Sequence, residues 1–262
     1  MPDHSPTRRR DPTPAPFYVA YLPVPLPIRR FLRLAVPATL WALVVVAVVM
    51  ARSHPDPGNA RWDTVTARTF TGVLDAHPYP VLHADVLPDG APGPILLVEL
   101  GKRGSSQRAA PFHAARVRAT GWLLRRDNRL MLELSPEHNA LALLHSAPGQ
   151  ASIPSPTRLG TVTLRGEIVD AKCFLGAMKP GHGKTHKECA TLCIRSGLPP
   201  MLVTRDASGS PTCYLLLDPS GGPMPDTLHA LIADPVELTG QLELIGGLPR
   251  IRVDPAGVQR IH

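Results

Sequence analysis

The sequence predicts a mainly β protein, in which one N-terminal transmembrane helix is followed by two tandem small β-barrels of the OB-like type. The second barrel is expected to carry a short inserted helix. Three observations predict this fold. A charge-free apolar run lies near the N-terminus, short alternating segments separated by turn residues fill the remainder, and the two halves of that remainder resemble each other. The 31 prolines among 262 residues disfavour long helices and favour short strands with frequent turns.

The apolar run extends from Leu34 to Ala51 and contains no charged residue. At 1.5 Å per residue it spans about 27 Å, close to the roughly 30 Å hydrocarbon core of a bilayer. A cleaved signal peptide is the competing interpretation, but it predicts a shorter apolar region and a small-residue cleavage site, and neither is obvious here. Residues 34–51 are therefore expected to form a single membrane anchor.

Positive charge is concentrated ahead of this anchor. Residues 1–33 hold six arginines and two aspartates, which account for +4 of the net charge of +7. Because positively charged flanking segments stay in the cytoplasm, we expect residues 1–33 to be cytoplasmic and the chain after the anchor to be exported. The exported part then carries only +3 and few aromatic residues, which is poor support for nucleic-acid binding.

The first half of the exported part is expected to form one OB-like domain over residues 62–146. It has an opening segment, a middle strand and a closing hairpin, at Thr69 to Leu82, Pro94 to Leu100 and Ala115 to Ser135. Apolar residues alternate along these segments with period two, as in strands that are buried on one face. A stretch rich in Pro, Gly and Ser over residues 147–160 is expected to be a linker.

The second OB-like domain is expected over residues 161–262. It repeats the order of an opening segment, middle strands and a closing hairpin, at Thr163 to Gly176, Met201 to Asp206, Cys213 to Asp218 and Asp234 to Asp254. Both closing hairpins contain V-x-x-T-G-x-L, in which Gly121 and Gly240 suit a sharp bend or bulge in a small barrel. Two small β-sandwiches are the alternative architecture.

The candidate functional residues lie in the long excursion of the second half, which is the segment between its opening strand and its first middle strand. This excursion includes "KPGHGKTHKECATLC" (Lys179 to Cys193). The letters GHGKT resemble the end of a phosphate-binding loop, which needs a leading glycine directly after a buried strand. Met178 occupies the leading glycine position, and the nearest strand ends well upstream. The sequence therefore gives no support for nucleotide binding.

The same excursion has the residues of a metal or thiol site. Thr185 and Glu188 form the pattern of a capping box, which predicts a short helix from His186 to Ser196. On this helix His186, Cys189 and Cys193 would share one face. The candidate metal ligands add Cys173 at the end of the opening strand and His182 on a glycine-flanked loop: Cys173, His182, His186, Cys189 and Cys193. Three thiols with imidazole suit zinc or copper.

Three alternatives to a metal stay open at these cysteines, one of which is a mostly apolar cysteine cluster. Structural disulfides are expected in an oxidising compartment, and a redox-active thiol is favoured by nearby cations. Four of the five lysines of the chain lie in this segment: Lys172, Lys179, Lys184 and Lys187. Such charges would lower the pKa of a neighbouring thiol. Cys213, in an alternating strand, is expected to be a buried core residue.

Residues Gly166 to Pro200 also resemble a recurring bacterial pattern, roughly G-E-[IV]-V-D-x-x-C followed by H-x-x-C-A-x-x-C-I-x-x-G-x-P. The matching residues are Cys173, His186, Cys189 and Cys193. The pattern is that of an uncharacterised family of exported or membrane-anchored proteins, and it implies that one histidine and three cysteines share a site. It implies no established activity.

Together these features predict a protein of the bacterial inner membrane with its C-terminal domains in the periplasm. Its Cys/His site would bind a metal or carry out thiol redox chemistry, as an accessory to a membrane complex. The alternative is a non-catalytic interaction module whose cysteines form structural disulfides. An enzyme with Cys173 as nucleophile and a histidine as base is less favoured, because the sequence identifies no third group to orient the base.

Overall fold

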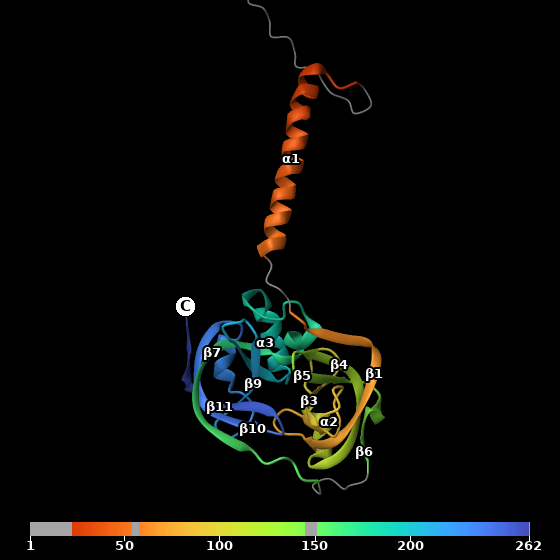
Figure 1. The fold of residues 1–262 in the computed structure, drawn as a ribbon, viewed down its shortest axis with the longest axis vertical. Helices are drawn as coiled ribbons and strands as arrows, with labels where there is room; N and C mark the ends of the chain where they lie inside the picture. The colour runs from red at the N-terminus through yellow and green to blue at the C-terminus, as the bar shows by residue number, and fades with distance from the viewer. Residues whose placement is uncertain (1–22, 54–57, 145–150, 262) are drawn as a thin grey trace, which may run out of the picture. The chain divides into compact units, whose positions relative to one another are not determined.

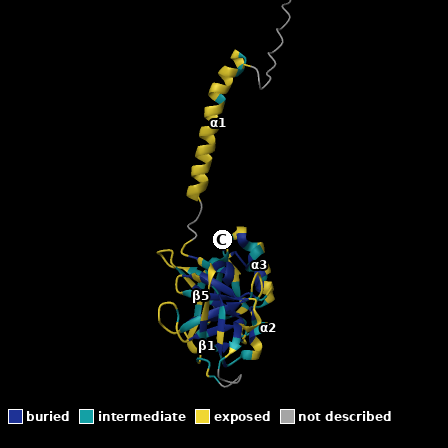
Figure 2. Ribbon diagram, turned by 90° about the vertical axis from the view of Figure 1, so that its right-hand side faces the viewer, coloured by how far each residue is buried: buried dark blue, intermediate teal, exposed yellow. Residues whose placement is uncertain are grey.

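The computed structural model describes residues 23–53, 58–144 and 151–261. It divides into two units, an N-terminal helix and a compact β body. Helix α1 (Leu26–Ser53) is long and apolar enough to cross a membrane, and Figure 2 shows it exposed along almost its whole length. It contains the predicted anchor and begins earlier, with Pro27 in its first turn, where a missing backbone N–H costs least. Most of the predicted cytoplasmic segment lies outside the described residues.

The first half of the β body is a closed five-stranded barrel (Figure 1). Its strands follow the order β1-β2-β3-β5-β4 around the ring, and β1 pairs with β4 to close it. All pairings are antiparallel except that between β3 and β5. The short strand β6 (Leu141–Leu143) extends the sheet at β4. The barrel strands are β1 (Arg61–Asp75), β2 (Val81–Ala84), β3 (Gly93–Val98), β4 (Ala115–Arg126) and β5 (Arg129–Leu134).

The second half is another closed five-stranded barrel with the same strand order, β7-β8-β9-β11-β10. Strands β9 and β11 form its one parallel pair, and β10 pairs with β7 to close it. The strands are β7 (Thr157–Asp170), β8 (Pro200–Arg205), β9 (Pro211–Leu217), β10 (Pro235–Ile245) and β11 (Leu248–Arg260). The two closed rings confirm the predicted barrels. Strand β7 begins at Thr157, so the last residues of the predicted linker are strand instead.

The two closing hairpins have matching registers. Gly121 lies opposite Leu134 in the β4–β5 hairpin, and Gly240 lies opposite Val253 in the β10–β11 hairpin. A Cβ at Gly121 or Gly240 would come within 1.9 Å or 2.6 Å of a carbonyl oxygen on the partner strand. Both positions therefore need glycine, because the strands approach each other closely where the barrel bends. The relation between the two halves as a sequence repeat stays a prediction.

The two barrels are joined by a common hydrophobic core. Side chains of the first barrel, such as Tyr79 and Met131, pack in one buried cluster with Phe174 of the second. The phenolic oxygen of Tyr79 accepts a hydrogen bond of 3.0 Å from the Met224 backbone N–H. Lys172 forms a buried ion pair across the barrels with Glu133 and donates hydrogen bonds to two carbonyl oxygens of the first barrel. The excursion that carries the cysteines is thus packed against the first barrel.

Candidate metal centre

The candidate residues lie on the excursion between β7 and β8. Strand β7 ends at Asp170, and a wide helical turn, Cys173–Ala177, follows. A 3-10 turn, Lys184–His186, then leads into helix α3 (Lys187–Arg195). The predicted helix is confirmed, but its predicted capping box is wrong. His186 is the N-cap residue and makes no side-chain cap, because Thr185 lies inside the preceding 3-10 turn.

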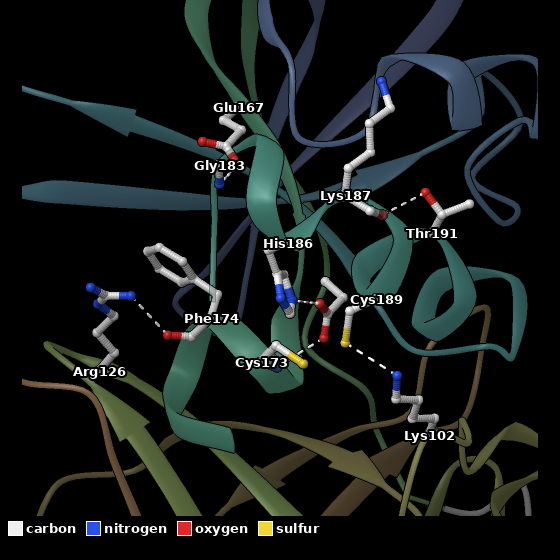
Figure 3. Close-up of polar contacts among 11 residues, drawn as sticks. Lys102, Arg126, Glu167, Cys173, Phe174, Gly183, His186, Lys187, Cys189 and Thr191 are labelled. Atoms are coloured by element: carbon white, nitrogen blue, oxygen red, sulfur yellow. Dashed lines mark hydrogen bonds and ion pairs between the residues drawn. The ribbon is translucent and has the colours of Figure 1, made fainter. Parts of the chain in front are cut away.

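The excursion brings the three cysteines and His186 together, as the sequence predicts. The ligand atoms of Cys173, His186 and Cys189 lie within 4.8 Å of one another, and Cys193 joins Cys173 and Asp170 in a second group of the same span. Figure 3 shows the side chains of Cys173, His186 and Cys189 converging from the wide turn, the 3-10 turn and α3, respectively. Cys173, Cys193 and His186 are buried, and Cys189 is half-buried.

Asp170 contacts two members of this group through its carboxylate. It is fully buried, and its Oδ1 atom accepts a hydrogen bond of 2.8 Å from the Cys173 backbone N–H. Its Oδ2 atom lies 3.1 Å from Nε2 of His186. A carboxylate that holds one nitrogen of an imidazole leaves the other nitrogen free and more basic, as in many metal sites. Sequence reasoning missed this role, although Asp170 lies only three residues before Cys173.

The three thiols also interact with one another. Sγ of Cys193 lies within 4.8 Å of Sγ of Cys173. The hydrogen bond from Cys173, together with the positive charge of Lys102, lowers the pKa of Cys193. The pKa of Cys173 is raised, because its thiol donates to Cys193 and is buried near the carboxylate of Asp170. All four cysteines of the chain are free thiols in this structure.

The lysine that contacts the thiol site, Lys102, belongs to the first barrel. Nζ of Lys102 donates a hydrogen bond of 3.2 Å to Sγ of Cys189 (Figure 3). Lys102 is the one lysine that lies outside the cationic segment identified in the sequence. Within that segment, Lys172 pairs with Glu133, and Lys187 pairs with Asp234 at 2.8 Å. The expectation that the local lysines act on the thiols is therefore wrong for these two, because carboxylates hold their charges elsewhere.

Comparisons with known proteins give no match. No family model, no curated protein and no solved structure matches this chain. The function is therefore inferred from the residues of the site itself.

His182 is not brought into the thiol group. Its Nδ1 lies 4.0 Å from Oε2 of Glu167, and its ring lies 6.3 Å from that of Phe174. These side chains line a separate cavity of about 330 Å³ that also includes Arg205. The glycines that flank His182 have φ angles of 70° and 81°, and these left-handed turns direct the loop toward Glu167. The structure thus separates the two candidate histidines.

Cys213 belongs to the core, as predicted. It is buried on β9, opposite Val203 of β8, in the cluster that joins the barrels. Burial raises the pKa of its thiol to about 11. It is in neither group of potential ligands among the described residues, so it offers a matched control cysteine for experiments on the other three.

The arrangement also resembles a Cys–His–Asp catalytic set more than the sequence suggested. Asp170 supplies the orienting group that was missing for the histidine base. However, Cys173 is only 5% exposed, and its raised pKa disfavours the thiolate that a nucleophile needs. A buried donor set is better suited to holding an ion than to attacking a substrate.

Proposed function

We propose that the second barrel binds one soft metal ion, zinc or copper(I), through Cys173, Cys189, Cys193 and His186. The observation that supports this proposal most is that the donor atoms of Cys173, His186 and Cys189 lie within 4.8 Å of one another, and that Sγ of Cys193 lies within 4.8 Å of Sγ of Cys173. Three thiolates and one imidazole form a closed four-ligand set that is typical of structural zinc sites and also suits copper(I). The ion would stabilise the excursion and fix α3 against the end of β7.

The surroundings of the site favour an ion with bound thiolates. A divalent ion with three thiolates carries one net negative charge, and the ammonium group of Lys102 next to Cys189 offsets it. The buried carboxylate of Asp170 orients the imidazole of His186, in the role that second-layer carboxylates have at metal sites. A purely apolar thiol cluster would give no role to the ammonium group of Lys102 or to the buried carboxylate of Asp170.

The proposal includes the cellular setting predicted from the sequence. The apolar helix α1 would anchor the chain in the bacterial inner membrane, and the arginines before it favour a cytoplasmic N-terminus with periplasmic barrels. A small, metal-loaded, non-catalytic domain tethered in this way would serve as an accessory to a membrane complex.

The competing function is that of an interaction module with structural disulfides. The thiols of Cys173 and Cys193 lie within 4.8 Å of each other, which favours this pairing, since it would join the end of β7 to α3. A single disulfide there would leave Cys189 as a free thiol and give His186 no ligand role.

Elemental analysis and thiol counting on the purified full-length chain separate the two functions. The metal-binding proposal predicts one equivalent of zinc or copper and four thiols that react only after denaturation with a chelator. Cys189→Ser should lose the metal, whereas Cys213→Ser should keep it. A chain without metal that shows two thiols and one disulfide would support the interaction module instead.

A further inference from the structure

A second candidate site lies on the first barrel, where β1 and β4 border a concave pocket of about 440 Å³. The pocket is lined by three arginines and a single acidic residue. The complete lining is Arg61, Trp62, Asp63, Arg68, Pro88, Leu123 and Arg125. It is separate from the thiol site and takes no part in the proposed metal binding.

The arginines of this pocket are poorly neutralised. Arg61 and Arg125 lie directly opposite each other on β1 and β4, an arrangement in which like charges are destabilising. Neither has an ion-pair partner among the residues that the structure describes. Arg68 lies 4.0 Å from the carboxylate of Asp63, at the outer limit for an ion pair. The pocket therefore has an excess of positive charge that a bound anion would neutralise.

An exposed apolar side chain stands beside these arginines. The register of β1 against β4 shifts between Trp62 and Ala67, so residues 63–66 bulge out of the sheet. Oδ1 of Asp63 accepts hydrogen bonds from the backbone N–H groups of Val65 and Thr66, which order this bulge. Val65 at its tip is 90% exposed. The bulge thus presents a valine to solvent next to a basic pocket.

We propose that this pocket binds the phosphate of an anionic phospholipid headgroup while Val65 enters the lipid interface. Guanidinium groups match phosphate oxygens in geometry and charge. An apolar side chain beside cations is typical of segments that lie at the surface of anionic membranes. A free phosphate ester would offer the same charge to the arginines but would make no use of Val65.

The connection to α1 supports a lipid as the source of the phosphate. Helix α1 is apolar enough to cross a membrane and ends at Ser53, eight residues before Arg61. Eight residues reach at most about 28 Å, a length that allows the pocket to approach a membrane surface. The barrel would then have two attachments to the membrane, the helix and this pocket.

Hydrogen–deuterium exchange on the full-length chain tests the proposal. The chain is placed in phosphatidylcholine nanodiscs with increasing phosphatidylglycerol content, and the amides of residues 61–68 are followed. The three samples are phosphatidylcholine nanodiscs alone, nanodiscs with added phosphatidylglycerol, and phosphatidylcholine nanodiscs with glycerol 3-phosphate in solution. Each arginine near an anionic surface is worth about fivefold in affinity. Arg61→Gln/Arg125→Gln should therefore weaken the response to phosphatidylglycerol about 25-fold. Arg118→Gln, another exposed arginine of β4 without an ion-pair partner among the described residues, is the matched control.

The expected result is protection of residues 61–68 with phosphatidylglycerol but not with phosphatidylcholine alone. Arg61→Gln/Arg125→Gln should weaken this response by the same factor of about 25, Val65→Ser should reduce it, and Arg118→Gln should retain it. Unchanged exchange in β10 and β11 of each variant establishes that the barrels remain folded. Equal protection by glycerol 3-phosphate, with no effect of Val65→Ser, would overturn the lipid as the source. Identical exchange in all three samples would overturn the anion site altogether.

Discussion

Asp170→Asn should weaken metal binding by about 10–100-fold, because Asp170 organises the donor set without being one of its proposed ligands. The wild-type carboxylate accepts from the Cys173 backbone N–H and from His186 at the same time. An asparagine has one acceptor atom and one donor group, so it can accept a hydrogen bond from only one of these two N–H groups. If its oxygen keeps the bond to Cys173, its amide donates to Nε2 of His186. The ring proton then moves to Nδ1, the nitrogen that the metal would need.

The energy of one hydrogen bond accounts for the loss of metal affinity expected from Asp170→Asn. The hydrogen bond that the imidazole N–H donates in the wild type goes to a fully buried charged group, and such bonds contribute about 1.5–3 kcal/mol, which corresponds to the expected 10–100-fold. Competition with a chromophoric chelator measures the affinity of the full-length chain. Asp218→Asn is the control, because Asp218 accepts its bonds from Ser220 and Gly222 in its own turn. An Asp170→Asn chain that folds normally and binds metal within twofold of wild type would refute the role of Asp170.

Three further predictions concern the stability of the body. Lys172→Met should cost about 3–5 kcal/mol in urea unfolding, because it leaves the buried carboxylate of Glu133 unpaired, and Lys172→Met/Glu133→Leu should recover most of that loss; equal stability of the two variants would contradict this. Burial raises the pKa of Tyr79 from 10 to about 12. The contribution of the neutral phenol to the free energy of unfolding is therefore complete below pH 10, and it falls by about 2 kcal/mol as the pH rises to 12. Tyr79→Phe should flatten that part of the pH–stability curve, and an unchanged slope would show that other groups cause it. Gly104→Ala should destabilise by about 1–3 kcal/mol, since its Cβ would lie 2.1 Å from the Gly197 carbonyl oxygen, and a neutral result in thermal unfolding would count against the close approach of the two segments.

The strands and hairpins could be predicted because their signals are local. Period-two alternation and the turn residues of each hairpin lie within about twenty residues of sequence. Closure of the first barrel depends instead on pairing between β1 and β4, as in the contact between Thr69 and Thr120, 51 residues apart. Sequence alone therefore left barrels and sandwiches as alternatives, and the β1–β4 and β10–β7 pairings decide between them.

Some residues of the candidate site could likewise be predicted from local sequence, and others could not. Helical spacing over the predicted helix, His186 to Ser196, indicates that His186, Cys189 and Cys193 share a face, and Cys173 follows from its place at the end of a strand. Lys102 reaches Cys189 across 87 residues of sequence, from a loop of the other barrel, and no local pattern indicates such a contact. His182 had the right residue type but lies on a glycine-flanked loop, whose backbone direction the sequence does not determine.

X-ray absorption spectroscopy of the metal bound to the full-length chain tests the central claim most directly. The proposed set of Cys173, Cys189, Cys193 and His186 predicts, for zinc, three sulfur neighbours at about 2.3 Å and one nitrogen at about 2.0–2.1 Å. Cys189→Ser should lose this spectrum together with the metal, and Cys213→Ser should leave it unchanged. A chain purified without any bound metal, or a metal with only oxygen and nitrogen neighbours, would contradict the account.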